Sequence, residues 1–196
     1  MATDRFHDDA VRLDSFVTPI DVVCPSYGAR AAVRSADDDA PARVVCRHCS
    51  FATDQHASGW LGAVEGIVDR RCPSCGERLE RRVTGPRHDH PTHLRSACGW
   101  ESDAVIWWEP VRSEGTDPMF GLDLWLRAPF RGDLLWAYNA EHLQFLKNYV
   151  TARVREREPK QNSSLASRLP KWIKSAKNRD DLVAAIEKLE ARSRLP

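Results

Sequence analysis

The chain has 196 residues, of which 42% are apolar and 29% are charged, and its formal net charge at pH 7 is +1. This composition is typical of a globular protein with a real core, and the near-neutral charge argues against a uniformly basic nucleic-acid coat. No apolar run approaches the roughly 20 residues of a membrane span, and the acidic start is unlike a signal peptide. We therefore expect a cytoplasmic protein whose cysteines are reduced.

The two ends of the chain carry opposite charge. Residues 1–40 contain eight aspartates and four arginines, whereas residues 151–196 contain twelve basic and six acidic residues. The acidic N-terminal segment, residues 1–20, has no clear periodicity. The basic end is either a solvated face, balanced by the acidic end, or a surface that binds phosphate groups.

Residues 21–53 have the pattern of a zinc ribbon, which is a β-hairpin with a cysteine turn at each end. A strand leads into the turn that begins at Cys24, and a partner strand leads into Cys46 and Cys49. Tyr27 stands where such a ribbon has its second cysteine. The sequence therefore predicts a first, degenerate zinc ribbon.

Residues 71–102 repeat this pattern after a connector, residues 54–70. Three glycines in the connector weaken a helix and favour a loop or a strand around 63–68. The second copy opens with a Cys-Pro-Ser-Cys-Gly turn at Cys72 and Cys75 and closes at Cys98. Arg95 stands where this copy requires its third cysteine. The repeat therefore predicts a second zinc ribbon, which lacks a cysteine in its second turn, whereas the first ribbon lacks one in its first turn.

The remaining residues, 103–196, predict an α+β module with a basic helical C-terminus. Its tryptophan-rich hairpin is expected to turn at the Arg-Gly-Asp tripeptide of residues 131–133. Asn139 is a good helix N-cap, and proline at 170 interrupts or restarts a later helix. The expected strands are 104–111, 122–126 and 134–138, and the expected helices are 140–156, 165–169, 170–177 and 180–193.

Three ligand assignments compete for one or two Zn²⁺ ions. The first follows the repeat and places Cys24, Cys46 and Cys49 in one site and Cys72, Cys75 and Cys98 in the other. In it, His93 is a candidate fourth ligand of the second site, and His48, His56 or a water completes the first. The second assignment joins the two intact CxxC pairs in one four-cysteine site. The third has one or both ribbons without metal, with Tyr27 packed in the place of a thiolate.

The basic C-terminal segment supplies the candidate nucleic-acid contacts. Clustered lysines and arginines, here around one tryptophan, can neutralise backbone phosphates. The candidates are Arg153, Arg155, Arg157, Lys171, Lys174, Lys177, Arg179 and Trp172. His142, on the expected helix after Asn139, is interpreted as a packing or surface histidine, and the sequence suggests no catalytic residue.

The segment Leu-Trp-Ala-Tyr-Asn at 135–139, the His-Leu pair that follows it and Leu-Pro-Lys-Trp at 169–172 resemble a group of small bacterial proteins. These uncharacterised proteins are common in actinobacteria and contain zinc ribbons. The resemblance covers residues 117–190 well and the cysteine turns loosely. It implies cysteine turns followed by this C-terminal module, and it implies no catalytic residues.

Together these patterns predict an α+β protein with two tandem zinc ribbons, a tryptophan-rich hairpin and about three C-terminal helices. We expect a non-enzymatic recognition or adaptor module for nucleic acid or for a protein complex that handles nucleic acid. The alternatives are a zinc-dependent hydrolase with an open metal position and a pure protein–protein adaptor with structural zinc.

Overall fold

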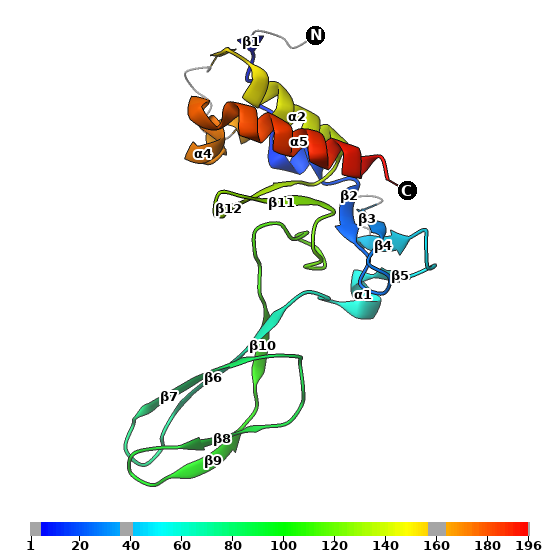
Figure 1. Cartoon of the computed structure of the whole chain (residues 1–196). Coiled ribbons are helices and arrows are strands. Elements are labelled where there is room, and N and C mark those ends of the chain that lie inside the picture. The colour runs from blue at the N-terminus through cyan, green and yellow to red at the C-terminus, as the bar shows by residue number, and fades with distance from the viewer. Residues whose placement is uncertain (1–4, 36–40, 157–163, 196) are drawn as a thin grey trace.

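The computed structural model describes residues 5–35, 41–156 and 164–195. In these residues the chain combines thirteen short strands with five α-helices and two 3-10 helices, which confirms the predicted α+β class. Figure 1 shows a helical part packed on small sheets, from which a second, strand-rich part extends away. None of the helices in the described residues has the length and apolar character needed to cross a bilayer. Arg157, one of the candidate nucleic-acid contacts, lies outside the described residues.

The first cysteine unit, residues 20–54, is a four-stranded antiparallel sheet in the order β2-β3-β4-β5. Each of its two cysteine turns joins neighbouring strands, because one turn links β2 to β3 and the other links β4 to β5. The prediction that the first strand pairs with the strand leading into Cys46 is wrong, because β3 lies between them. The strands are β2 (Ile20–Val23), β3 (Arg30–Arg34), β4 (Arg43–Cys46) and β5 (Ala52–Asp54).

The second cysteine unit, residues 64–110, contains two hairpins, β6–β7 and β8–β9, and a strand β10 that returns to pair with β6. The strand expected around 63–68 is confirmed, and it is longer than expected. The predicted ribbon boundaries at 71 and 102 cut through this paired unit. A one-turn helix, α1 (Gln55–Ser58), precedes the unit. The strands are β6 (Val64–Arg71), β7 (Arg78–Thr84), β8 (Thr92–Arg95), β9 (Glu101–Ala104) and β10 (Trp107–Pro110).

The tryptophan-rich hairpin consists of β11 (Leu126–Phe130) and β12 (Asp133–Ala137). Its two-residue turn, Arg131 and Gly132, has positive φ at both positions, as a tight hairpin turn requires, so the predicted turn is confirmed. The strand expected over 122–126 is wrong.

The buried carboxylate of Asp117 explains this difference. It accepts hydrogen bonds from the backbone N–H groups of Met119, Phe120 and Leu122 at 2.9, 2.8 and 2.6 Å. These bonds hold residues 117–122 in a compact loop. Beyond it, the N–H groups of Leu124 and Trp125 donate to the carbonyls of Gly115 and Asp21, both at 2.9 Å, so regular pairing with β12 begins only at Leu126.

The first long helix, α2 (Ala140–Thr151), begins where predicted, because the Asn139 side chain accepts a hydrogen bond from the His142 N–H at 2.9 Å. It ends five residues earlier than expected. The chain then forms β13 (Val154–Arg155), which pairs in parallel with β1 (Arg5–Phe6). Arg153 and Arg155 are therefore not on a helical face.

The C-terminal helices follow the predicted pattern of caps and breaks. Ser164 caps the first of them, and Pro170 separates it from the next. Along the last helix, Leu182, Ile186 and Leu189 are buried, as expected from their spacing, whereas Val183, also expected to face inward, is only partly buried. The elements are η1 (Leu13–Phe16), α3 (Leu165–Arg168), α4 (Lys171–Lys174), η2 (Ala176–Asn178) and α5 (Arg179–Ser193).

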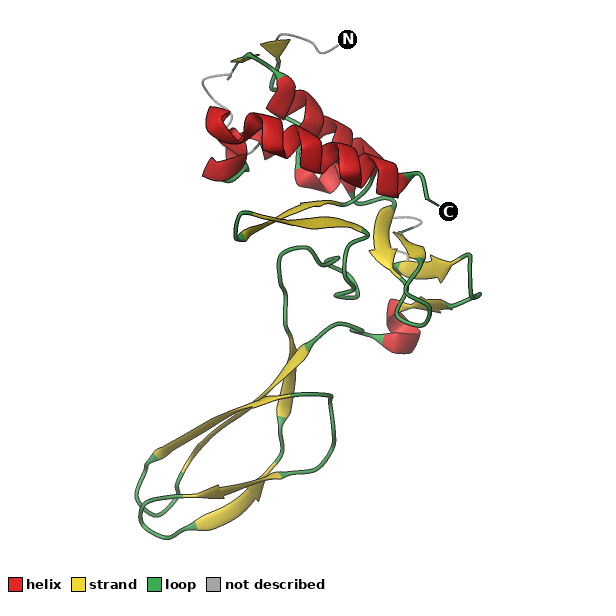
Figure 2. Ribbon diagram, viewed as in Figure 1, coloured by secondary structure: helices red, strands yellow, loops and turns green. Residues whose placement is uncertain are grey.

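One large core joins the first cysteine unit to the C-terminal module. Its buried members include Val22 and Val44 of the sheet, Leu126 of the hairpin and Leu143 and Ile186 of the helices. Figure 2 shows α2 and α5 side by side over the β11–β12 hairpin, with the four-stranded sheet next to it. Residues 21–53 and 103–196, predicted as separate domains, therefore share a core. The second cysteine unit has a small core of its own, formed by Val68, Leu94, Ala104 and Ile106.

His142 lies inside the large core, which confirms the interpretation as a packing histidine. It is 2% exposed, and its ring stacks on Phe16 with a centroid distance of 5.0 Å. Its Nδ1 accepts a hydrogen bond from the Tyr138 N–H at 3.2 Å. Burial lowers the His142 pKa to about 4, so the ring is neutral at pH 7.

This buried histidine predicts acid sensitivity. In the unfolded chain the pKa rises to about 6.5, so the unfolded state binds a proton that the folded state excludes. The histidine's contribution to stability is therefore intact above about pH 6.5 and is lost as the pH falls toward 4. At pH 5 the loss amounts to about 2 kcal/mol, measurable by urea unfolding at pH 7.5 and pH 5.

His142→Phe removes the titrating group. We expect this variant to be less stable at pH 7.5 by about 1 kcal/mol, because the Tyr138 N–H loses its acceptor, but less sensitive to acid by about 2 kcal/mol. Replacing the exposed His56 by alanine is the control and leaves the acid sensitivity unchanged. If His142→Phe retained the full acid sensitivity, the assignment would be wrong.

Candidate metal centres

The first cluster of cysteines lies where the two turns of the first cysteine unit meet. Cys24 follows β2, Cys46 ends β4 and Cys49 lies in the turn before β5. The three sulfur atoms lie within 4.8 Å of one another, and those of Cys24 and Cys49 are 3.6 Å apart. Cys24 and Cys46 are buried, whereas Cys49 is exposed, so the cluster opens on one side.

The second cluster has the same construction in the second cysteine unit. Cys72 and Cys75 occupy the turn between β6 and β7, and Cys98 lies in the turn between β8 and β9. Their sulfur atoms also lie within 4.8 Å of one another, with 3.6 Å between Cys72 and Cys98. The backbone N–H of Ala97 donates to the Glu77 carboxylate at 2.7 Å, which ties the two turns together.

The turns are built by a repeated backbone hydrogen bond. The N–H of Cys24, Cys46 and Cys72 donates to the carbonyl five residues later at 2.7, 2.8 and 2.8 Å. In the fourth turn, Ser96 donates to the carbonyl of Trp100, four residues later, at 2.9 Å. Three turns therefore share one geometry, and the fourth is one residue shorter.

The sulfur spacing fits a metal ion better than a disulfide. Tetrahedral coordination with zinc–sulfur bonds of about 2.3 Å places neighbouring sulfur atoms about 3.8 Å apart. A disulfide requires about 2.05 Å, which is far shorter than the observed 3.6 Å. All six cysteines are free thiols in the structure. Two groups of three cysteines are thus arranged so that each could hold a metal ion.

Hydrogen bonds in the turns favour the thiolate form, which is the form that binds metal, at one cysteine of each cluster. Burial disfavours ionisation of Cys72, but the Ser96 hydroxyl and the backbone N–H groups of Cys75 and Ser74 outweigh it and lower the Cys72 pKa to about 6. Burial likewise opposes ionisation of Cys46, and the N–H groups of His48 and Cys49 overcome it, so that the pKa is lowered.

The cysteines group as the repeat predicts. The alternative four-cysteine site is not formed, because Cys46 and Cys49 lie in one cluster and Cys72 and Cys75 in the other. Tyr27 does not pack in the place of a thiolate. Its side chain is 66% exposed and stacks on His48, with ring centroids 6.3 Å apart.

Histidines take no part in either cluster among the residues that the structure describes. His93, the predicted fourth ligand, is exposed on β8, and its Nδ1 lies 3.0 Å from the Asp103 carboxylate. His93 Nε2 lies 3.6 Å from the Glu101 carboxylate. The structure therefore does not bring His93, the candidate fourth ligand, to the second cluster.

Ser96 is the site residue that alignment of the two cysteine repeats did not identify. It is 4% exposed, and its hydroxyl lies 3.0 Å from the Cys98 sulfur and 3.4 Å from the Cys72 sulfur. Arg95, which aligns with the missing cysteine, points away and pairs with Glu101 at 3.2 Å. The shorter fourth turn shifts the register by one residue, and the Ser-x-Cys-Gly spacing is the signal that indicates it.

Half of the candidate nucleic-acid residues have internal roles. The Arg155 guanidinium donates to the carbonyls of Tyr149 and Lys174 at 3.0 and 2.7 Å. Arg179 donates to the Ala152 carbonyl at 3.2 Å. The Tyr149 and Ala152 carbonyls lie at and just beyond the C-terminal end of α2, and the Lys174 carbonyl ends α4, so these bonds satisfy helix-terminal carbonyls that have no helical partner.

Of the other candidates that the structure describes, two have internal contacts and three are exposed. The Lys174 ammonium donates to the Ser167 carbonyl at 2.7 Å, and Trp172 stacks on Phe130 with centroids 5.2 Å apart. Arg153, Lys171 and Lys177 are exposed.

Metal content tests the paired clusters directly. Elemental analysis of the purified protein is expected to give two zinc ions per chain. Cys46→Ser with Cys49→Ser, and Cys72→Ser with Cys75→Ser, should each lower this value to one, because each pair removes two thiolates from a single site. His93→Ala is the matched control and keeps two ions. One ion in the unmodified chain, or loss of an ion in His93→Ala, would contradict the assignment.

Comparison with known proteins does not assign the chain to a family. No protein-family model matches the chain, and neither a curated protein nor a solved structure matches it. The resemblance to bacterial zinc-ribbon proteins therefore stays a prediction, and function is argued from the two cysteine clusters and the surfaces around them.

Proposed function

We propose that this protein is a non-enzymatic recognition module in which two structural zinc ions close two zinc-ribbon units. The observation that carries this proposal is the pair of three-cysteine clusters, each with its sulfur atoms within 4.8 Å of one another. A bound zinc ion supplies a cross-link between two turns that are distant in sequence. Such a cross-link is valuable where little apolar core is available, as in the second cysteine unit.

The proposed partner is nucleic acid or a protein that handles nucleic acid. Lys171, Lys177 and Arg168 are exposed on or next to the short helices α3 and α4, where they are available to phosphate groups. Arg155 and Arg179, whose guanidinium groups bond to carbonyls at the end of α2, are not counted as part of this surface. The proposed contact area is therefore smaller than the eight-residue set expected from the sequence.

A zinc-dependent hydrolase is the alternative that the three-cysteine clusters also allow, because a fourth coordination position is left for water. It requires a general base beside that position. Around the second cluster, the described contacts to the sulfur atoms come from Ser96 and from the turn itself. This favours a structural role. Zinc-dependent turnover in a substrate panel, lost with Cys72→Ser, would instead support the hydrolase.

Salt-dependent binding tests the nucleic-acid proposal. In gel shifts with generic DNA and RNA, the unmodified protein should bind more weakly as salt rises, because phosphate contacts release counterions. Lys171→Glu with Lys177→Glu should weaken binding to all sequences and lower the slope of log K against log salt by about two.

The matched control is Lys188→Glu, an equally exposed lysine toward the C-terminal end of α5. It should leave the slope unchanged if the contact surface is centred on α4. Binding that is absent, flat with salt or equally affected by both changes would contradict the nucleic-acid proposal and favour a protein partner.

A further inference from the structure

A cavity of about 640 Å³ lies between the β11–β12 hairpin and the short helices α3 and α4. Its lining comes from η1 and the residues beside it, the loop before β11, strand β12, helix α2 and the α3–α4 segment. Pockets of roughly 300–1,000 Å³ are typical of sites for small organic ligands. This cavity contains no cysteine and is separate from both candidate metal centres.

Two tryptophans give the cavity flat apolar walls. Trp172 is held by stacking on Phe130, and Trp136 contacts the His142 ring edge-on with centroids 5.7 Å apart. Both indole rings line the cavity together with leucines of α2 and α3. Because these rings are fixed by packing, they are ready to receive a planar ligand without rearrangement.

One ring nitrogen of a buried side chain opens onto the cavity and has no hydrogen-bond partner among the described residues. The His142 ring is 2% exposed and lines the cavity, and its Nδ1 is occupied by the Tyr138 N–H. The proton of the neutral ring is therefore on Nε2. Within the described residues, no hydrogen bond reaches this Nε2. An N–H donor in such a place gains most from an acceptor oxygen that a ligand brings in.

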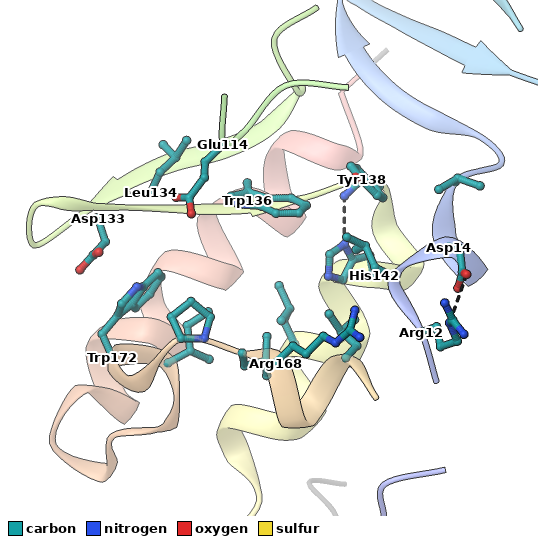
Figure 3. Close-up of a pocket in the computed structure, with 17 residues that line it drawn as sticks. Arg12, Asp14, Glu114, Asp133, Leu134, Trp136, Tyr138, His142, Arg168 and Trp172 are labelled. Carbon is teal, nitrogen blue, oxygen red and sulfur yellow. Dashed lines mark hydrogen bonds and ion pairs between the residues drawn. The ribbon is translucent and has the colours of Figure 1, made fainter. Parts of the chain in front are cut away.

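The charges around the cavity favour a cation. Its lining contains two arginines and three carboxylates, and Arg12 is already paired with Asp14 at 3.2 Å. The carboxylates of Glu114 and Asp133 make no ion pair or hydrogen bond with any residue in the described parts of the chain. Figure 3 shows these two carboxylates toward the end where Trp172 lies, and His142 toward the other end.

These features together define a ligand. We propose that the cavity binds a small organic cation with a flat apolar body, whose positive group lies near Trp172, Glu114 and Asp133 and whose far end carries an acceptor oxygen for His142. Indole faces attract cations through their quadrupole, and the two carboxylates add to that attraction. Arg168, which also lines the cavity, disfavours a second positive charge on the ligand.

Three small probes separate the parts of this proposal. 2-Phenylethylamine carries the cation and the flat body, 4-methoxyphenylethylamine adds an acceptor oxygen at the far end, and 3-phenylpropionate replaces the cation by an anion. Binding to the full chain is measured by ligand-observed NMR titration at pH 7.5. We expect a Kd of about 1 mM for the methoxy compound, as is typical of ligands of this size, and at least tenfold weaker binding of 3-phenylpropionate.

Variants of the chain test which residues are responsible. Glu114→Gln with Asp133→Asn should weaken both amines by about fivefold or more, and the exposed Asp180→Asn on α5 is the control that changes nothing. His142→Phe keeps a ring in place but removes the donor, so it should reduce the methoxy compound to the affinity of 2-phenylethylamine.

Thermal unfolding of each variant identifies any that fail to fold. If His142→Phe fails to fold, the variant with Glu114→Gln and Asp133→Asn still tests the proposal, because both of its changes are at the surface. No saturable binding of either amine, equal or tighter binding of 3-phenylpropionate, or amine binding that is unaffected by the carboxylate changes would overturn the proposal.

Discussion

Three sulfur atoms held within 4.8 Å of one another are the constraint on which each cysteine unit depends. Thiolates at this spacing repel one another unless a cation lies between them, and the turns already favour the thiolate at Cys72. The consequence differs between the two units. The first shares the large core with α2, α5 and the hairpin, whereas the second has four buried apolar side chains of its own. A metal ion held by each cluster would therefore stabilise the second unit more than the first.

The connection between the two parts depends on a second buried charge. Asp117 is fully buried, and burial raises its pKa, although three backbone N–H groups oppose the shift. The loop that it holds presents the Phe120 carbonyl, which accepts hydrogen bonds from Leu61 and Gly62 at 2.9 and 2.8 Å. A Cβ at Gly62 would lie 2.4 Å from the Gly121 carbonyl oxygen, so this approach requires glycine. The chain entering the second cysteine unit is thereby anchored to the module.

Local patterns in the sequence predict those features that local chemistry determines. The cysteine repeat predicts the two clusters, Asn139 predicts the start of α2, and Pro170 predicts the break between α3 and α4. The end of α2 was not predictable from periodicity, because β13 pairs with β1, about 150 residues away. The strand expected at 122–126 failed because its N–H groups have scattered partners: Leu122 donates to the Asp117 carboxylate, Leu124 to the Gly115 carbonyl and Trp125 to the Asp21 carbonyl.

The roles of single polar residues were also hidden from the sequence. Aligning the repeat by spacing places Arg95 at the missing ligand, but the shorter fourth turn brings Ser96 to the sulfur atoms instead. Arg155 and Arg179 look like surface charge in a basic segment, and their carbonyl partners at and beyond the end of α2 are visible only in three dimensions. Composition identifies a basic end, whereas packing decides which of its charges remain for a partner.

The central claim is that each cluster coordinates zinc through three sulfur atoms, with the fourth position left to a lighter atom. X-ray absorption at the zinc K-edge of the purified protein measures this directly. The account predicts, as the average over both sites, three sulfur atoms at about 2.3 Å and one oxygen or nitrogen at about 2.0 Å. Four sulfur atoms per zinc would show that the cysteines of the two units combine in one site, and a spectrum without sulfur ligands would contradict both centres.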